Sequence, residues 1–70
     1  MMPLKLAPMD EELTIQRIGG NEMLKKHLSD LGFVVGATLK VVAQTNGNMI
    51  VNVKEARVAI GEQLAMKIFV

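Results

Sequence analysis

The segment HLSDLGFVVGATLKVV, His27–Val42, passes from helical to strand spacing, and this transition decides the fold. One helix face is marked by three leucines, Leu24, Leu28 and Leu31. Strand-like alternation follows in Leu39, Val41 and Ala43. Between the two patterns, Gly32 and Gly36 bracket a short apolar loop. The loop is either part of the core or a surface for a partner.

The apolar loop consists of Phe33, Val34 and Val35. We expect Phe33 in the core, because a large aromatic side chain rarely stays exposed in so small a protein. Val34 and Val35 cannot point the same way in extended backbone, so at least one of them faces solvent. An exposed valine near Lys26 and His27 would suit a partner surface, although an isolated surface valine is also ordinary.

Residues 21–31 are predicted to form one α-helix of about three turns. Asn21 fits the N-cap position, and Glu22 suits the positive end of the helix dipole. Gly32 is placed to end the helix in a left-handed conformation. The leucine stripe must face the rest of the protein, which leaves Lys26 and the flank that carries His27 facing outward.

Two strands, 38–45 and 48–54, are predicted on either side of an Asn-Gly pair, which is typical of a two-residue turn. A two-residue turn with regular pairing would place Val41 opposite Asn52. That arrangement would mix apolar and polar side chains on one face of the hairpin.

A three-residue loop, Thr45–Gly47, instead joins apolar residues across the hairpin: Val41 with Val51, Leu39 with Val53 and Ala43 with Met49. Because a one-residue slip inverts every side chain, burial should select this register. We therefore predict the three-residue loop, with Gly47 left-handed in a bulge.

The remaining elements are short. Leu4 and Leu6 suggest a strand or an extended lead-in, and residues 13–18 read as a strand that ends at a Gly-Gly pair. Further strands are predicted over 57–60 and 66–70, with a C-terminal helical turn over 61–65 between them. The pattern predicts a mainly β fold, a small closed barrel with one inserted helix, because closure removes exposed strand edges.

Composition restricts the class of protein. Seventy residues, half of them apolar, predict one domain over residues 1–70 with a modest core. Eight basic residues face seven acidic ones, and there is no tryptophan or tyrosine, so nucleic-acid binding is not favoured. No apolar run reaches bilayer length, and the first residues lack the long apolar region of a signal peptide. We expect a soluble cytoplasmic protein without direct membrane insertion that acts by contact.

Catalytic and metal-binding residues are not predicted. The chain has no cysteine, and His27 is its only histidine, so a site built from His27 and Asp30 would be weak. Neither Ser29 nor Thr45 has a neighbouring base that would activate a nucleophile. We therefore expect no enzyme activity, no cofactor and no resident metal.

Several motifs, in order and at family spacing, give the chain a resemblance to the FeoA family. They are Ile15–Gly20, Leu31-Gly32-Phe33 with Gly36, Arg57–Gly61, and Ala65 with Ile68 and Val70. The resemblance implies an SH3-like β-barrel. It also implies a cytoplasmic accessory role in bacterial ferrous iron uptake, beside the FeoB membrane transporter and its cytoplasmic GTP-binding domain.

Three positions depart from the family pattern. Members usually have arginine where this chain has His27, which puts one shared surface contact in question. They often have glycine at Asp10 and a glycine turn at Glu55-Ala56. These two departures change only turn chemistry, since aspartate tolerates left-handed backbone better than most residues.

The leading hypothesis is an interaction protein that binds or regulates an FeoB-type transporter. The expected partner surface is the helix with its following loop, represented by Lys26, His27, Val34 and Val35. The alternative is an SH3-like nucleic-acid-associated module of the translation-factor type. Weak self-association is left open.

Overall fold

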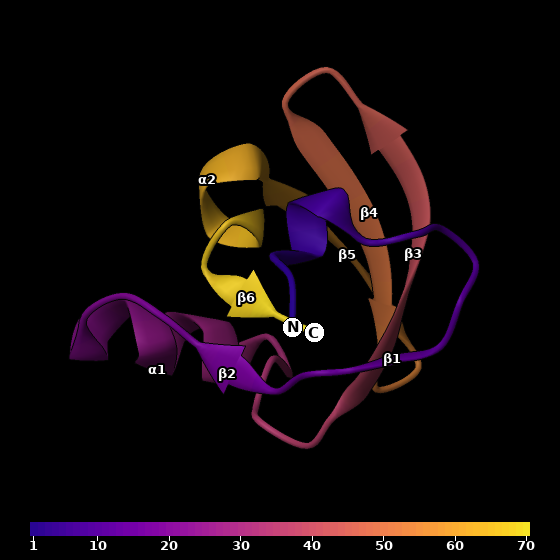
Figure 1. The fold of residues 1–70 in the computed structure, drawn as a ribbon. Helices are drawn as coiled ribbons and strands as arrows, with labels where there is room; N and C mark the ends of the chain where they lie inside the picture. Colours follow the sequence, from indigo (N-terminus) through magenta and orange to yellow (C-terminus); the bar gives the residue numbers. More distant parts are fainter.

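The computed structural model describes residues 1–70 as a mainly β fold with two short α-helices (Figure 1). One antiparallel sheet has the order β1-β3-β4-β5, formed by Leu13–Thr14, Thr38–Thr45, Asn48–Val53 and Ala56–Gly61. The second sheet pairs β2 with β6, Arg17–Ile18 and Ile68–Phe69. The helical elements are the 3-10 turn η1, Leu4–Leu6, and the α-helices α1, Glu22–Asp30, and α2, Glu62–Ala65.

The core consists of thirteen buried hydrophobic residues and no buried polar side chain. Both sheets and all three helical elements contribute: Leu4, Ala7, Ile15, Leu28, Phe33, Leu39, Val41, Met49, Val51, Val53, Ile60, Ala65 and Ile68. Side chains on β4 alternate between the core and the outer face, as a strand with one buried face requires. This core holds α1 and its loop against one end of the sheets (Figure 1).

The predicted closure of the barrel is wrong. The two sheets are separate hydrogen-bonded units, and β5 pairs only with β4. The second sheet has only two residues per strand, and its β6 strand is flanked by the chain start, where the Met2 N–H donates to Val70 O at 2.9 Å. The β6 edge that would close the ladder is thus occupied, and β5 remains an edge strand.

The predicted strand over 13–18 is two strands in different sheets. Leu13 pairs with Leu39 of β3, whereas Ile18 pairs with Ile68 of β6. The buried Ile15 lies between the two strands. Its backbone N–H and C=O form hydrogen bonds with the loop that follows α1 and not with a strand. This bend carries the chain from one sheet to the other and encloses the core between them.

The β3–β4 hairpin confirms part of the predicted register and contradicts its loop. Val41 pairs with Val51 and Leu39 with Val53, as predicted. Thr45 nevertheless pairs directly with Asn48, so the turn has two residues. The two observations coexist because a bulge shifts the register between Val41 and Ala43, which inserts one residue into β3.

The N-terminal segment is also different from the prediction. Leu4 and Leu6 belong to the 3-10 turn η1 and not to a strand. Proline at position 3, with φ −61°, is preorganised to start such a turn. The turn directs Leu4 fully into the core and leaves Leu6 exposed, so the two leucines do not share one face as alternate residues of a strand would.

Candidate functional site

Helix α1 is positioned by its cap and by its leucine stripe. The Asn21 side chain accepts a hydrogen bond from the Leu24 N–H at 2.8 Å, which confirms the predicted N-cap. Leu28 is fully buried, and Leu24 and Leu31 pack against the core. The opposite side of α1 faces solvent.

Gly32 ends α1 in the predicted left-handed conformation, with φ +104°. Its N–H donates to Ser29 O at 2.9 Å, and the Phe33 N–H donates to Leu28 O at 2.9 Å. This is the Schellman arrangement, which pairs otherwise unsatisfied carbonyls at a helix end. Leu28 and Phe33 are both buried, so the helix end is packed as well as hydrogen-bonded.

The loop after Phe33 is a tight turn held to the segment between β1 and β2. The Ala37 N–H donates to Val34 O at 3.0 Å, with Gly36 at φ +91° inside the turn, the geometry that favours glycine. Ile15 holds the second half of the turn, because its carbonyl accepts from the Gly36 N–H at 2.8 Å and its own N–H donates to Ala37 O at 2.9 Å. Val35 lies at the outer corner of a backbone that is fixed on both sides.

Burial answers the question that the loop sequence raises. Phe33 is 1% exposed and belongs to the core, as predicted. Val34 is half-buried, whereas Val35 is 64% exposed. The loop is therefore partly core and partly surface, and of the two valines Val35, at the corner of the turn, is the exposed one.

Lys26 and His27 both face solvent from α1. The Lys26 side chain is 79% exposed, and its Nζ lies 3.7 Å from Asp30 Oδ2, one helical turn away. An exposed pair of this kind contributes little stability, so Lys26 remains free to reorient toward a partner. Val35 lies beyond the C-terminal end of α1, so the predicted residues form two groups, one on the helix and one on the loop that follows it.

Met23 is a candidate contact residue that the sequence reasoning missed. Its side chain is 82% exposed on α1, and it borders an open hollow of about 490 Å³ together with Asn21, Leu24 and His27. The signal was available in the sequence, because Met23 lies off the Leu24–Leu28 stripe of a helix whose polar face must be exposed. A flexible, polarisable methionine at such a position adapts well to an apolar partner surface.

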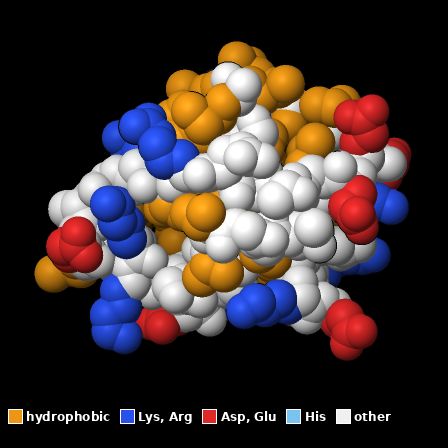
Figure 2. Space-filling model, turned by 60° about the horizontal axis from the view of Figure 1, so that its bottom comes forward, with side chains coloured by type: hydrophobic (Ala, Val, Ile, Leu, Met, Phe, Trp, Pro, Cys, Tyr) orange, Lys and Arg blue, Asp and Glu red, His pale blue; other side chains and the backbone are white.

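Figure 2 shows the molecule turned so that the bottom of Figure 1 comes forward. Hydrophobic side chains gather in a broad patch near its upper edge and in smaller groups elsewhere, and Lys and Arg side chains border them on the side where Figure 1 places α1. Apolar groups with a charged margin are the usual arrangement of a protein-binding surface.

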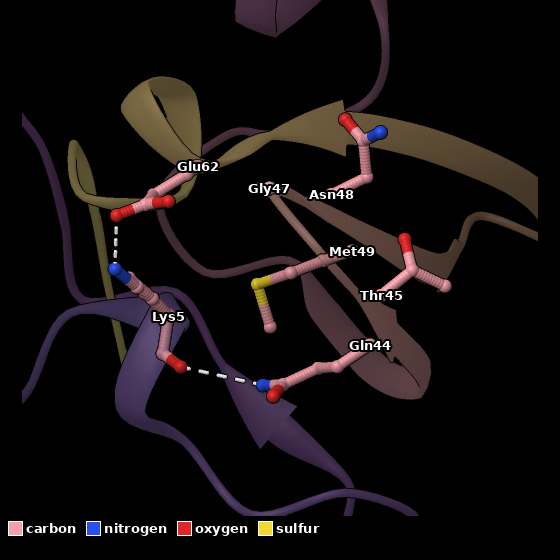
Figure 3. Close-up of a pocket in the computed structure, with 7 residues that line it drawn as sticks. All are labelled: Lys5, Gln44, Thr45, Gly47, Asn48, Met49 and Glu62. Atoms are coloured by element: carbon pink, nitrogen blue, oxygen red, sulfur yellow. Dashed lines mark hydrogen bonds and ion pairs between the residues drawn. The ribbon is translucent and has the colours of Figure 1, made fainter.

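A second hollow lies at the opposite end of the molecule, beneath the β3–β4 turn (Figure 3). It measures about 70 Å³ and is lined mainly by polar residues: Lys5, Gln44, Thr45, Gly47, Asn48, Met49 and Glu62. Lys5 forms an ion pair with Glu62, and its carbonyl accepts from Gln44 Nε2 at 3.3 Å. These contacts connect η1 with α2 and the hairpin, so the hollow has a structural explanation.

The structure does not bring three or more His, Cys, Asp or Glu side chains together as a metal site. Neither α1 nor α2 has the length and apolar composition that crossing a bilayer requires.

Comparisons with known proteins agree with this fold. The FeoA domain model matches residues 2–70. A Methanocaldococcus jannaschii protein named as an Fe(2+) transport protein A is 37% identical over 70 residues, which cover 100% of this chain and 85% of the relative. The crystal structure of an iron uptake regulatory protein, FeoA, is 26% identical with a TM-score of 0.88, covering 96% of this chain and 91% of that one.

The crystal structure of Stenotrophomonas maltophilia FeoA, described as a prokaryotic SH3 domain protein in complex with zinc, shares the fold at 23% identity. Its TM-score is 0.82, and the match covers 99% of this chain and 88% of that one. The fold is therefore SH3-like, as the sequence resemblance implied. The family model matches residues 2–70, and the relative that is 37% identical aligns with the whole chain. This protein therefore belongs to the FeoA domain family.

Proposed function

We propose that this protein is a cytoplasmic accessory factor of ferrous iron uptake that binds the cytoplasmic GTP-binding domain of an FeoB-type transporter. Membership of the FeoA domain family and the Fe(2+) transport name of the 37% identical relative support the process. The partner surface in this proposal consists of α1 and the loop after it, with Met23, Lys26, His27, Val34 and Val35 as contact residues.

The observation that carries the proposal is the fixed loop with an exposed apolar corner. Val35 is 64% exposed, yet the backbone on both sides of it is hydrogen-bonded: Val34 O accepts from the Ala37 N–H, and the Gly36 N–H donates to Ile15 O. Because a surface that is already ordered loses little conformational entropy on binding, such a loop is well suited to recognition. In the proposed complex, the Val35 side chain enters an apolar pocket of the transporter domain.

The charges of α1 are balanced, with two lysines against Glu22 and Asp30, and they fit a partner rim that carries both signs. Lys25 and Lys26 are both exposed, and they lie beside the exposed Met23 and His27. Charges at the margin of an apolar contact mainly set association rate and orientation. The protein acts on the transporter by binding one of its conformations more tightly than another, since that difference is the only way a bound partner can shift an equilibrium.

Calorimetric titration of the purified transporter domain with this protein tests the proposal. Val35→Asp is expected to weaken binding by about tenfold or more, because it places a charge in an apolar contact, and to leave the melting temperature nearly unchanged. Thr45→Asp is the matched control, since Thr45 is exposed at the hairpin tip, far from the loop (Figure 1).

The other outcomes are informative. Full-strength binding by Val35→Asp together with lost binding by Thr45→Asp would move the partner surface to the hairpin. Absence of binding by the wild-type protein would contradict the proposed partner. Salt-dependent binding of single-stranded RNA would instead favour the translation-factor alternative, because phosphate contacts release counterions.

A further inference from the structure

Strand β5 leaves one edge of the larger sheet unpaired. It is the last strand in the order β1-β3-β4-β5 and extends from Ala56 through Gly61. The two-residue turn before it makes Val53 and Ala56 a hydrogen-bonded pair, and antiparallel pairs then alternate along the strand. The N–H and C=O groups of Arg57, Ala59 and Gly61 consequently point away from β4.

These outward groups have no partner within the chain, except the carbonyl of Gly61, which as the N-cap of α2 accepts the first hydrogen bond of that helix. None of the backbone hydrogen bonds outside the helices and ladders involves Arg57, Ala59 or the Gly61 N–H, and no side chain bonds their backbone. Gly61 remains extended, with φ −76° and ψ 163°, so the free edge continues up to the start of α2.

The edge also lacks the features by which sheets usually prevent pairing. It contains no proline, lysine or bulge, and its solvent-facing side chains are small except for Arg57. The Arg57 Nε donates to Asn52 Oδ1 at 3.4 Å, which draws this side chain across the sheet toward β4 and away from the open edge.

We propose that β5 is a self-association surface, on which β5 of a second copy of this chain pairs antiparallel across a two-fold axis at Ala59. In this register Ala59 faces Ala59 of the second copy, and Arg57 faces Gly61. Both pairs fit without steric conflict, because the methyl groups are small and glycine leaves room for the arginine stem. The two four-stranded sheets become one continuous sheet.

The residues of β5 fit the same strand in reverse order, which favours a second copy over a strand of a different protein. In the antiparallel register, the net positive start of each strand, with Lys54, Glu55 and Arg57, lies beside the neutral ion pair of Lys5 with Glu62 at the end of the other, so no like charges meet. The half-buried Val58 also lies opposite Ile60 of the second copy, which extends the apolar inner face.

Sedimentation of Ala59→Lys, Ala59→Glu and their equimolar mixture tests the proposed register. Wild-type protein should associate reversibly to a dimer between roughly 10 µM and 1 mM, as a small backbone-mediated interface would. Each variant alone should associate at least about fivefold more weakly than wild type, since like charges lie directly opposite each other. The equimolar mixture should recover association, because it pairs opposite charges. The control is Thr45→Lys, which places a lysine at an exposed position on β3, and it should associate like wild type.

Amide hydrogen exchange provides a second readout. The amides of Arg57 and Ala59 should exchange more slowly as protein concentration rises, whereas the amides of Val58 and Ile60, already bonded to β4, should not change. A wild-type protein that stays monomeric at about 1 mM would overturn the proposal. Variants that dimerise like wild type, or a mixture without recovery, would overturn it as well. None of these measurements involves the transporter, so they are independent of the proposed function.

Discussion

At the scale of single residues, the turn between β4 and β5 carries unusual backbone strain. Lys54 and Glu55 have φ values of 49° and 64°, so both central residues of a two-residue hairpin are left-handed. This is the type I′ geometry that Asn-Gly normally fills, because residues with large side chains resist it. The two central residues of this turn are Lys54 and Glu55, so the turn lies one residue earlier than the Glu55-Ala56 turn expected from the sequence.

The double variant Lys54→Asn/Glu55→Gly is expected to stabilise the protein by about 1 kcal/mol through relief of this strain. Urea denaturation would measure the change, and the melting temperature should rise by roughly 4–8 °C. Lys54→Gln/Glu55→Gln removes the same charges and keeps the strain, so this control should leave stability nearly unchanged. Equal stabilisation by both double variants would show that charge, and not backbone geometry, is responsible.

Gly47 in the β3–β4 turn shows the opposite case, a strained position that glycine already fills. Its φ is +80°, and a Cβ atom there would meet no other atom within 4 Å. Gly47→Val should therefore destabilise by about 1 kcal/mol or more through backbone strain alone. Gly61→Ser is the control, because Gly61 has ordinary φ and serine is a good N-cap for α2. A Gly47→Val variant as stable as wild type would contradict this explanation.

At the scale of elements, α1 depends on its N-terminal cap because it has only nine residues and one fully buried leucine. Asn21→Ala removes the acceptor of the Leu24 N–H and should cost about 1 kcal/mol. Asn21→Ser keeps a capping oxygen and should cost much less. Denaturant unfolding of the three proteins tests this ordering, and equal stabilities would mean that tertiary packing alone maintains the helix.

At the scale of the whole molecule, Leu4 joins the N-terminal turn to a core shared by both sheets. It is fully buried, and Leu4→Ala should cost about 2–5 kcal/mol, a large share of the stability of so small a domain. Leu6→Ala makes the same change two residues later on an exposed side chain and should have little effect. Thermal unfolding separates the two variants. Similar melting temperatures would indicate that η1 does not take part in the cooperative core.

The isolated protein is also predicted to have no tight iron or zinc site. His27 is the only strong nitrogen ligand, the chain has no cysteine, and divalent transition metals usually require three or four protein ligands. Calorimetric titration with Fe²⁺ and Zn²⁺ should show no stoichiometric submicromolar binding to the monomer. Such binding would refute this prediction and direct attention to His27 with a backbone or carboxylate partner.

Local patterns in the sequence predicted much of the structure. The Asn21 cap, the leucine stripe of α1, the left-handed Gly32 and the burial of Phe33 all follow from spacing and side-chain type within a few residues. The helical turn after Gly61 is likewise local. Errors arose where a local pattern had two solutions, as in the hairpin, where a bulge reconciles a two-residue turn with apolar pairing.

The sequence by itself determined the mainly β composition, the inserted helix and the apolar loop, because hydrophobic periodicity, caps and glycines act over short distances. Only the tertiary structure decided three features: the division of residues 13–18 between two sheets, the exposure of Val35 rather than Val34, and the unpaired edge of β5. Each depends on hydrogen bonds between segments far apart in the chain. Whether a backbone group finds such a distant partner is settled by the packing of the whole core, which no short window of sequence contains.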